Sequence, residues 1–295
     1  QGDVSSSRFA IWRNALALAA LHPWTGVGWG NFNFAWTFTP FPERPVAFFD
    51  HAHNLPLHLA VEMGVPATTL VLGLLGGALW RARGAWLLPA AHERSARAAV
   101  VLLAVLALHS LLEYPLWYAY FLLPAAWAFG TALRAEPRSA GVASGRAAGL
   151  WRAWGVGMAL AATYAVWDHR RIEAIYAPTA GAAPLASRIA DGRGSLLFGH
   201  HADYAAVTTP PGVADVASFR RPLHQLIDVR LMRAYIDALR AAGNDDAALY
   251  AAQRLREFRR SDAQAYFSAC GPANETPPFQ CEEAPLPLTW RDLDP

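Results

Sequence analysis

The sequence predicts an all-α, polytopic helical membrane protein with a C-terminal periplasmic helical tail. Of its 295 residues, 54% are hydrophobic and only 16% are charged, which is too apolar for an ordinary soluble domain. Four apolar runs approach the about 20 residues that a helix needs to cross a bilayer. The chain then becomes polar and repeats its apolar residues at helical spacing. All 25 basic residues are arginines, and the net charge of +2 gives no reason to expect a nucleic acid partner.

The four apolar runs define the expected topology. They cover residues 65–80, 97–113, 116–133 and 149–167. Two of the connecting loops are rich in arginine and are expected in the cytoplasm by the positive-inside rule; their arginines are Arg81, Arg83, Arg94, Arg97, Arg134, Arg138, Arg146 and Arg152. The short connection "EYP" carries none and is expected on the other side. The predicted domains are therefore a periplasmic loop with an amphipathic helix and a histidine motif (1–64), four transmembrane helices (65–167) and a periplasmic helical tail (168–295).

The beginning of the chain carries no initiating Met and no signal peptide. We therefore expect it to be the C-terminal part of a longer protein, so that further spans and arginines of its site lie upstream.

The tail is predicted to contain a helical hairpin around the break "AAGNDD". Gly243 would end the first helix, and Asn244 or Asp245 would cap the second. Residues 176–215 are rich in Ala, Gly and Pro and are predicted to be irregular. The only two cysteines, Cys270 and Cys281, lie in a Pro-rich loop of this tail; they would form a disulfide in an oxidising periplasm or remain two free thiols.

The stretch "DHAHNLPLHLAVEMGVPA" concentrates ionisable groups just before the first apolar run. They are Asp50, His51, His53, His58 and Glu62. Helical zinc ligands need histidines at i and i+4, whereas the second and third histidines here are five apart, so we expect no metal. His58 and Glu62 do have the i, i+4 spacing, and the carboxylate could simply be the partner of this histidine.

The same stretch contains the signals of a short helix over residues 55–63. Asn54 is a good N-cap, and Gly64 followed by Pro66 would break the helix before the span proper. The N-terminus of a helix attracts phosphate through its unpaired N–H groups and its dipole. His53 at such a position, beside a membrane, is a candidate acid or base.

Three motifs in order carry a family resemblance. The first is "SSSRFAIWRNALALAALHPWTGVGWGNF", an Arg-x-x-x-Trp helix followed by a glycine-rich turn. The second is "HAHNLPLHLAVEMGVPA", in which His53, Asn54 and Gly64 match and Ala67 replaces a glycine. The third is "LHSLLEYPLWYAYFLLPAAWAFG" at 108–130. Together they resemble the bacterial O-antigen ligase and polymerase superfamily, and within it the protein O-oligosaccharyltransferases that glycosylate pilin.

The resemblance implies transfer of a preassembled glycan from undecaprenyl pyrophosphate to a hydroxyl of an acceptor such as pilin, at the periplasmic face of the bacterial inner membrane. It implies no cofactor and no metal. His53 would be the base, and Arg8 would hold the pyrophosphate, although an arginine at this place could also bind lipid phosphate. Candidate substrate-binding residues are Asn54, Arg13, Glu62, Glu113 and Tyr114.

Two other functions remain open at this point. The protein could be an O-antigen ligase or polymerase, with lipid A core or glycan as the acceptor. It could also be a non-catalytic component of a membrane transporter. A transporter is expected to place polar residues near the middle of its spans, whereas here they gather at the ends of the spans and in loops, which favours the enzyme.

Overall fold

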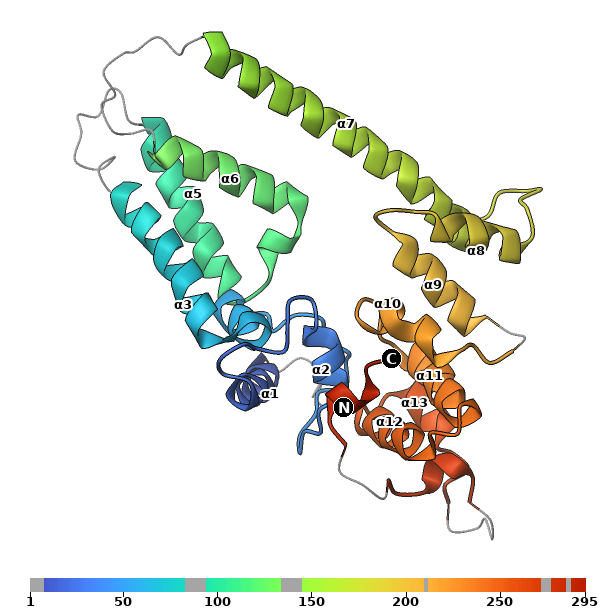
Figure 1. The fold of residues 1–295 in the computed structure, drawn as a ribbon. Helices are drawn as coiled ribbons and strands as arrows, with labels where there is room; N and C mark the ends of the chain where they lie inside the picture. The colour runs from blue at the N-terminus through green and yellow to red at the C-terminus, as the bar shows by residue number, and fades with distance from the viewer. Residues whose placement is uncertain (1–7, 83–93, 134–144, 210–211, 272–276, 285–287) are drawn as a thin grey trace. The chain divides into compact units, whose positions relative to one another are not determined.

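The computed structural model describes residues 8–82, 94–133, 145–209, 212–271, 277–284 and 288–295, and every regular element within them is helical (Figure 1). The chain divides into two compact units, residues 1–139 and 140–295, which we take one at a time. Arg83, Arg134 and Arg138 of the predicted cytoplasmic loops lie outside the described residues.

The described part of the first unit is helical, and its longest element is α3. Its elements are α1 (Arg8–Leu21), α2 (Phe32–Phe38), α3 (Leu55–Ala82), α5 (Arg94–Ser110), the short 3-10 helix η2 (Pro115–Trp117) and α6 (Ala119–Leu133). Helices α3, α5 and α6 lie side by side (Figure 1). Their shared core contains Ala99, Leu103, Ala128 and Ala132, with Leu79 against it. Alanines at the contact let the helix backbones approach closely.

Membrane-spanning length is clear for one of these helices. The segment Leu55–Arg81 is long and apolar enough to cross a bilayer, and Ala119–Leu133 is a shorter apolar helix. At 1.5 Å per residue, the 17 residues of α5 cover about 25 Å, somewhat less than the hydrocarbon thickness. The described helices therefore establish one candidate span, and the four-span arrangement remains a proposal.

The second unit begins with the long helix α7. Its elements are α7 (Gly145–Tyr176), α8 (Leu185–Arg193), α9 (Gly199–Thr208), η3 (Val216–Phe219), α10 (Arg220–Leu223), α11 (Val229–Ala241), α12 (Asp245–Glu257), α13 (Ser261–Tyr266), η4 (Phe279–Cys281) and η5 (Trp290–Leu293). The predicted span 149–167 lies within α7, whose C-terminal part packs on α8 and α9.

The prediction that residues 176–215 are irregular is wrong, because this stretch contains α8 and α9. Both helices bury small or branched side chains against the end of α7, and the core formed there includes Ile172, Ile175, Ile189, Ala202 and Ala205. The approach is so close that a Cβ on Gly192 would lie 2.7 Å from a methyl carbon of Ile175. The alanines favour a helix intrinsically, and packing on α7 outweighs the helix-breaking tendency of the glycines and prolines.

The predicted hairpin of the tail is confirmed as α11 and α12. Gly243 has a φ of 77°, which residues other than glycine rarely adopt, and it follows the end of α11. The side chain of Asn244 accepts a hydrogen bond from the N–H of Ala247 and so caps α12. A disulfide joins Cys270 and Cys281 beside this hairpin.

Candidate active site

The helix α3 is broken near its start, at Gly64. Gly64 has a φ of 76° and a ψ of 166°, outside the helical region, and Pro66 has no N–H to donate to the carbonyl four residues before it. The carbonyls of Val61 and Glu62 therefore lose their usual partners within the helix. The break that the sequence predicted at this position is confirmed.

The glycine-rich turn after α1 supplies the missing donors. The N–H of Val27 donates to the carbonyl of Val61 at 2.8 Å, and the N–H of Gly28 donates to the carbonyl of Glu62 at 3.0 Å. Both carbonyls are thereby satisfied, as backbone groups removed from water need to be. The turn and the helix break are complementary parts of one structure.

Two glycines are required where the turn meets the break. A Cβ on Gly64 would lie 2.4 Å from the carbonyl oxygen of Trp24, and a Cβ on Gly26 would lie 2.4 Å from the carbonyl of Glu62. Both glycines also have a positive φ. Any larger residue would push the turn away from the helix.

The side chain of Glu62 fixes the other end of the turn. Its Oε1 accepts hydrogen bonds from the N–H groups of Gly30 at 3.0 Å and Phe32 at 3.3 Å, where α2 begins. Its Oε2 lies 3.5 Å from Nε2 of His58. Because the residue is buried and its oxygens face these groups, Glu62 holds the turn and α2 against α3.

His53 directly precedes the cap of α3. Its φ of 50° lies in the left-handed region, which is sparsely populated for a residue with a side chain and occurs often at functional sites. Asn54 accepts a hydrogen bond from the N–H of Leu57 at 3.0 Å and donates through Nδ2 to the carbonyl of Leu111 at 3.0 Å. This second bond attaches the start of α3 to the turn that follows α5.

That turn carries Glu113, which joins the two predicted catalytic residues. Its Oε2 lies 2.7 Å from Nδ1 of His53, and its Oε1 accepts a hydrogen bond from Nη2 of Arg8. The side chains of His53, Glu113 and Arg8 are 19%, 33% and 47% exposed. The hydrogen-bonded chain therefore runs from a largely buried imidazole to a guanidinium that solvent can reach. Figure 1 locates the three elements that supply it: α1, the start of α3 and the end of α5.

The charge state of Glu113 determines the tautomer of His53. Partial burial alone would raise the pKa of Glu113, but the hydrogen bonds from Arg8 and His53 outweigh it and hold the pKa below the ordinary value of 4.5. An ionised carboxylate only accepts, so Nδ1 of His53 must carry the proton. In the neutral form of the ring, Nε2 then carries the free lone pair that a general base requires.

Aromatic rings surround the imidazole of His53. Tyr114 meets it edge to face at 4.9 Å, and Phe49 does so at 5.6 Å. Tyr114 in turn stacks on His51 at 4.4 Å with the planes only 8° apart. His51 stacks on His58 at 5.0 Å, so these rings present faces to one another rather than converging nitrogens. In the described part of the chain, no three potential ligands form a metal site.

Arg13, like Glu62, is a predicted site residue whose side chain binds partners other than His53. It forms an ion pair with Glu43, while Asn14 donates to the carbonyl of Glu43 at 2.9 Å. The partnership of His53 with Glu113 was missed by sequence reasoning, since the two lie 60 residues apart. The available signal was topological, because the predicted spans place both on the same side of the membrane.

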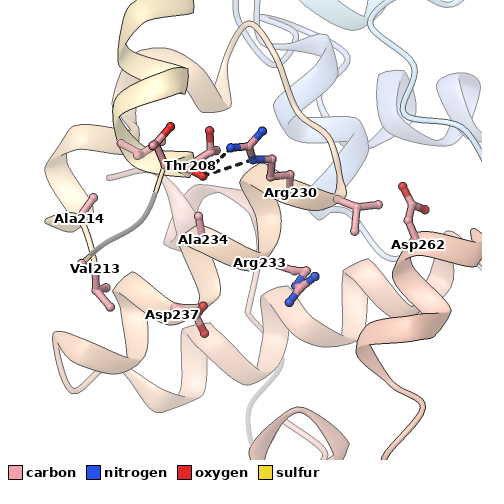
Figure 2. A pocket seen from close by; sticks show the side chains of 12 residues that line it. Thr208, Val213, Ala214, Arg230, Arg233, Ala234, Asp237 and Asp262 are labelled. Carbon is pink, nitrogen blue, oxygen red and sulfur yellow. Dashed lines mark hydrogen bonds between the residues drawn. The ribbon is translucent and has the colours of Figure 1, made fainter. Parts of the chain in front are cut away.

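The second unit contains a polar pocket of about 580 Å³ bounded by α9, α11 and α13 (Figure 2). Arg230 donates from Nε and Nη2 to the carbonyl of Thr208, at 3.2 and 2.8 Å, and so closes one end of the pocket. Arg233, Asp237 and Asp262 also line it. Burial raises the pKa of Asp237 despite the neighbouring arginines. All of the residues that line this pocket belong to the second unit.

Two family patterns match the chain. Residues 97–269 match the family described as the C-terminal part of virulence factor membrane-bound polymerases, and residues 1–72 match the O-antigen ligase family. The first match covers more than half of the chain.

A known relative points the same way. The general O-oligosaccharyltransferase of Acinetobacter baylyi is 32% identical over 133 residues, which are 44% of this chain and 22% of that protein. The chain thus aligns with only about a fifth of the relative's length. No solved structure matches the chain. On the fold, the ordered motifs and these matches, the chain belongs to the O-antigen ligase and membrane-bound polymerase superfamily.

Proposed function

We propose that the protein transfers a preassembled glycan from undecaprenyl pyrophosphate to a Ser or Thr hydroxyl of a periplasmic protein such as pilin. The observation that carries the proposal is the hydrogen-bonded chain of Arg8, Glu113 and His53 at the start of α3. The name of the Acinetobacter relative supports a transferase of oligosaccharides onto oxygen.

In the proposed mechanism, His53 acts as the general base. Nε2 takes the proton of the acceptor hydroxyl while that oxygen attacks the anomeric carbon of the first sugar. The bond from this carbon to the pyrophosphate breaks, the pyrophosphate keeps the electron pair, and the single displacement inverts the anomeric centre. Glu113 stabilises the imidazolium that forms and keeps the ring in one orientation.

The departing pyrophosphate is stabilised by groups outside that pair. Arg8 uses one N–H group on Glu113, and the rest of its guanidinium is accessible to a phosphate. The positive end of the dipole of α3 lies at the same place and favours a negative charge there. Free N–H groups contribute little, because Pro56 has none and the N–H of Leu57 is bonded to Asn54. The proposed mechanism therefore uses only side chains and backbone of this chain, with no metal or cofactor.

The remaining candidate residues receive supporting roles in this proposal. Asn54 positions the start of α3 against the turn that carries Glu113. The ring of Tyr114 packs edge to face against the imidazole of His53. Glu62 holds the glycine-rich turn rather than the substrate, and Arg13 is the least supported substrate ligand because Glu43 binds its guanidinium.

The proposed location is the inner membrane, with several spans and the active site at the periplasmic face. Outward-facing leucines and valines on α3, α5 and α6 support this placement, since they would otherwise contact water. They include Leu70, Leu74, Val101, Val105, Leu108, Leu122 and Leu123.

An O-antigen ligase acting on lipid A core is the second candidate, because residues 1–72 match that family. It uses the same donor and the same base and differs in the acceptor. The match of residues 97–269 also leaves room for a polymerase whose acceptor is another glycan.

The test is replacement of His53 by Ala in the full-length protein, expressed in a strain that lacks it. Glycosylation of the acceptor protein is followed by intact mass, and lipopolysaccharide is followed by gel mobility. We expect loss of the protein-linked glycan. His109→Ala is the matched control, since this histidine makes an edge contact with Phe121 and lies outside the proposed chain. Unchanged glycosylation would remove the catalytic role, and a loss confined to lipopolysaccharide would favour the ligase.

A further inference from the structure

The loop between α8 and α9 displays two adjacent leucines to the outside. Leu196 is 74% exposed and Leu197 is 46% exposed, although the neighbouring Ser195 and Gly199 are buried. Single exposed apolar residues are common on protein surfaces, so the meaning of this pair depends on what holds the loop and on what lies beside it.

A buried carboxylate holds this loop in place. Oδ2 of Asp168 accepts hydrogen bonds from Oγ of Ser195 at 2.7 Å and from the N–H of Leu197 at 3.0 Å. Oγ of Ser195 also accepts from the N–H of Phe198 at 2.9 Å. Asp168 itself is fully buried. The leucines are therefore presented by a fixed loop attached to α7.

The hydrogen bonds to Asp168 determine where along α7 the two leucines lie. Asp168 directly follows the predicted span 149–167, and helical side chains lean toward the N-terminus of their helix. The loop consequently lies beside the last turn of that span. At the same level, Trp167 is half exposed and the guanidinium of Arg171 lies 4.6 Å over its ring. Trp and Arg together are typical of the headgroup layer of a bilayer.

We propose that Leu196 and Leu197 insert into the interfacial layer of the membrane that α7 crosses and so dock α8 and α9 onto its surface. The partner is lipid because the loop continues the apolar exterior of α7, where Leu150, Trp151, Trp154, Val156 and Leu160 are exposed. The inference rests on the several membrane spans of the proposed function and on the predicted span 149–167 of α7 being one of them. It adds a second contact between the tail and the bilayer, beside the helix itself.

Depth-dependent fluorescence quenching tests this in the full-length protein reconstituted into lipid nanodiscs. Single cysteines replace Leu196, Leu160 or Val213 and carry an environment-sensitive fluorophore; Cys270 and Cys281 are bonded to each other and do not react. Phosphatidylcholine carries a nitroxide either in the headgroup or in the middle of an acyl chain. All three positions are exposed apolar residues, so labelling should leave the fold intact.

We expect the label at Leu196→Cys to be quenched mainly by the headgroup nitroxide and the label at Leu160→Cys mainly by the acyl-chain nitroxide. The label at Val213→Cys, on another loop of the tail, should be quenched by neither. Deep quenching at 160 without quenching at 196 overturns the docking proposal while leaving α7 in the membrane. Absence of quenching at 160 shows that the proposed membrane placement itself has failed, and equal quenching at 196 and 213 overturns the assignment of this loop.

A second variant tests the role of the fixed loop. Ser195→Ala removes one of the hydrogen bonds to Asp168 but leaves the exposed leucines in the sequence. Headgroup quenching of the label at Leu196→Cys should fall about twofold, because a loosened loop spends less time in the interface. Unchanged quenching in this background would show that Asp168 does not set the depth of the loop.

Discussion

Replacing Glu113 by Gln separates the charge of this residue from its shape. Glutamine occupies nearly the same volume and can still accept a hydrogen bond from Nδ1 of His53. It loses the negative charge that faces Arg8 and that would stabilise the imidazolium formed during transfer. The substitution therefore tests whether Glu113 acts on catalysis through His53.

The contacts of Glu113 set the size of the expected effect. A hydrogen bond to a charged group contributes about 1.5–3 kcal/mol, and each 1.36 kcal/mol is about a factor of ten in rate. The side chain of Glu113 is 33% exposed, so solvent screens part of its charge. We therefore expect the lower part of this range, a fall of about tenfold in the rate of transfer.

The assay measures initial rates of glycan transfer by purified full-length protein from a lipid pyrophosphate donor to an acceptor peptide. Glu43→Gln is the matched control, because Glu43 also pairs with an arginine of α1, but with Arg13 and not with Arg8. It should keep the wild-type rate. If Glu113→Gln transfers glycan as fast as the wild type while His53→Ala does not, the carboxylate does not assist the base and the proposed chain is refuted.

Three further predictions concern stability. Gly64→Ala should destabilise the first unit by about 1–3 kcal/mol or more, because alanine is strained at the positive φ and its Cβ would clash with the glycine-rich turn. Gly77→Ala should instead stabilise α3 by about 0.5–1 kcal/mol, because a Cβ there meets nothing within 4 Å. Thermal unfolding in detergent distinguishes the two signs. The pKa of Glu113 is lowered, so its ion pair with Arg8 stabilises the fold fully above pH 4.5 and is lost gradually as the pH falls from 4.5 through the lowered value. The difference in melting temperature between wild type and Glu113→Gln should therefore persist down to pH 4.5 and shrink below it. A difference that disappears near pH 6 would contradict this. Reduction of the Cys270–Cys281 disulfide should destabilise the tail by about 2–4 kcal/mol. The expected result is faster proteolysis of the full chain after treatment with dithiothreitol. An unchanged cleavage rate would show that the bond contributes little.

Local features of the fold could be predicted from the sequence because they depend on residues with special backbone chemistry. Gly64 and Pro66 indicated the break in α3, and Asn54 indicated its cap, since each acts within one helical turn. Gly243 and Asn244 gave the hairpin of the tail for the same reason. These residues carry their signal whatever surrounds them.

Features that depend on distant contacts could not be predicted in this way. The sequence named His53, Arg8 and Glu113 separately, but their hydrogen bonds join segments separated by 60 and 105 residues. Helices α8 and α9 were missed because small residues become helical there by packing on α7. Periodicity and propensity describe neighbours along the chain, so such contacts leave no local pattern.

The complementary bonding between the glycine-rich turn and the break in α3 has a consequence for exchanging parts with relatives. The turn donates to carbonyls that only a broken helix leaves free, and the break is tolerated only where the turn lies against it. A hybrid that takes one segment from another sequence would leave buried donors and acceptors unmatched. Functional hybrids should therefore inherit residues 22–32 and 61–66 as one block, even though α2, a loop and the first turns of α3 lie between them.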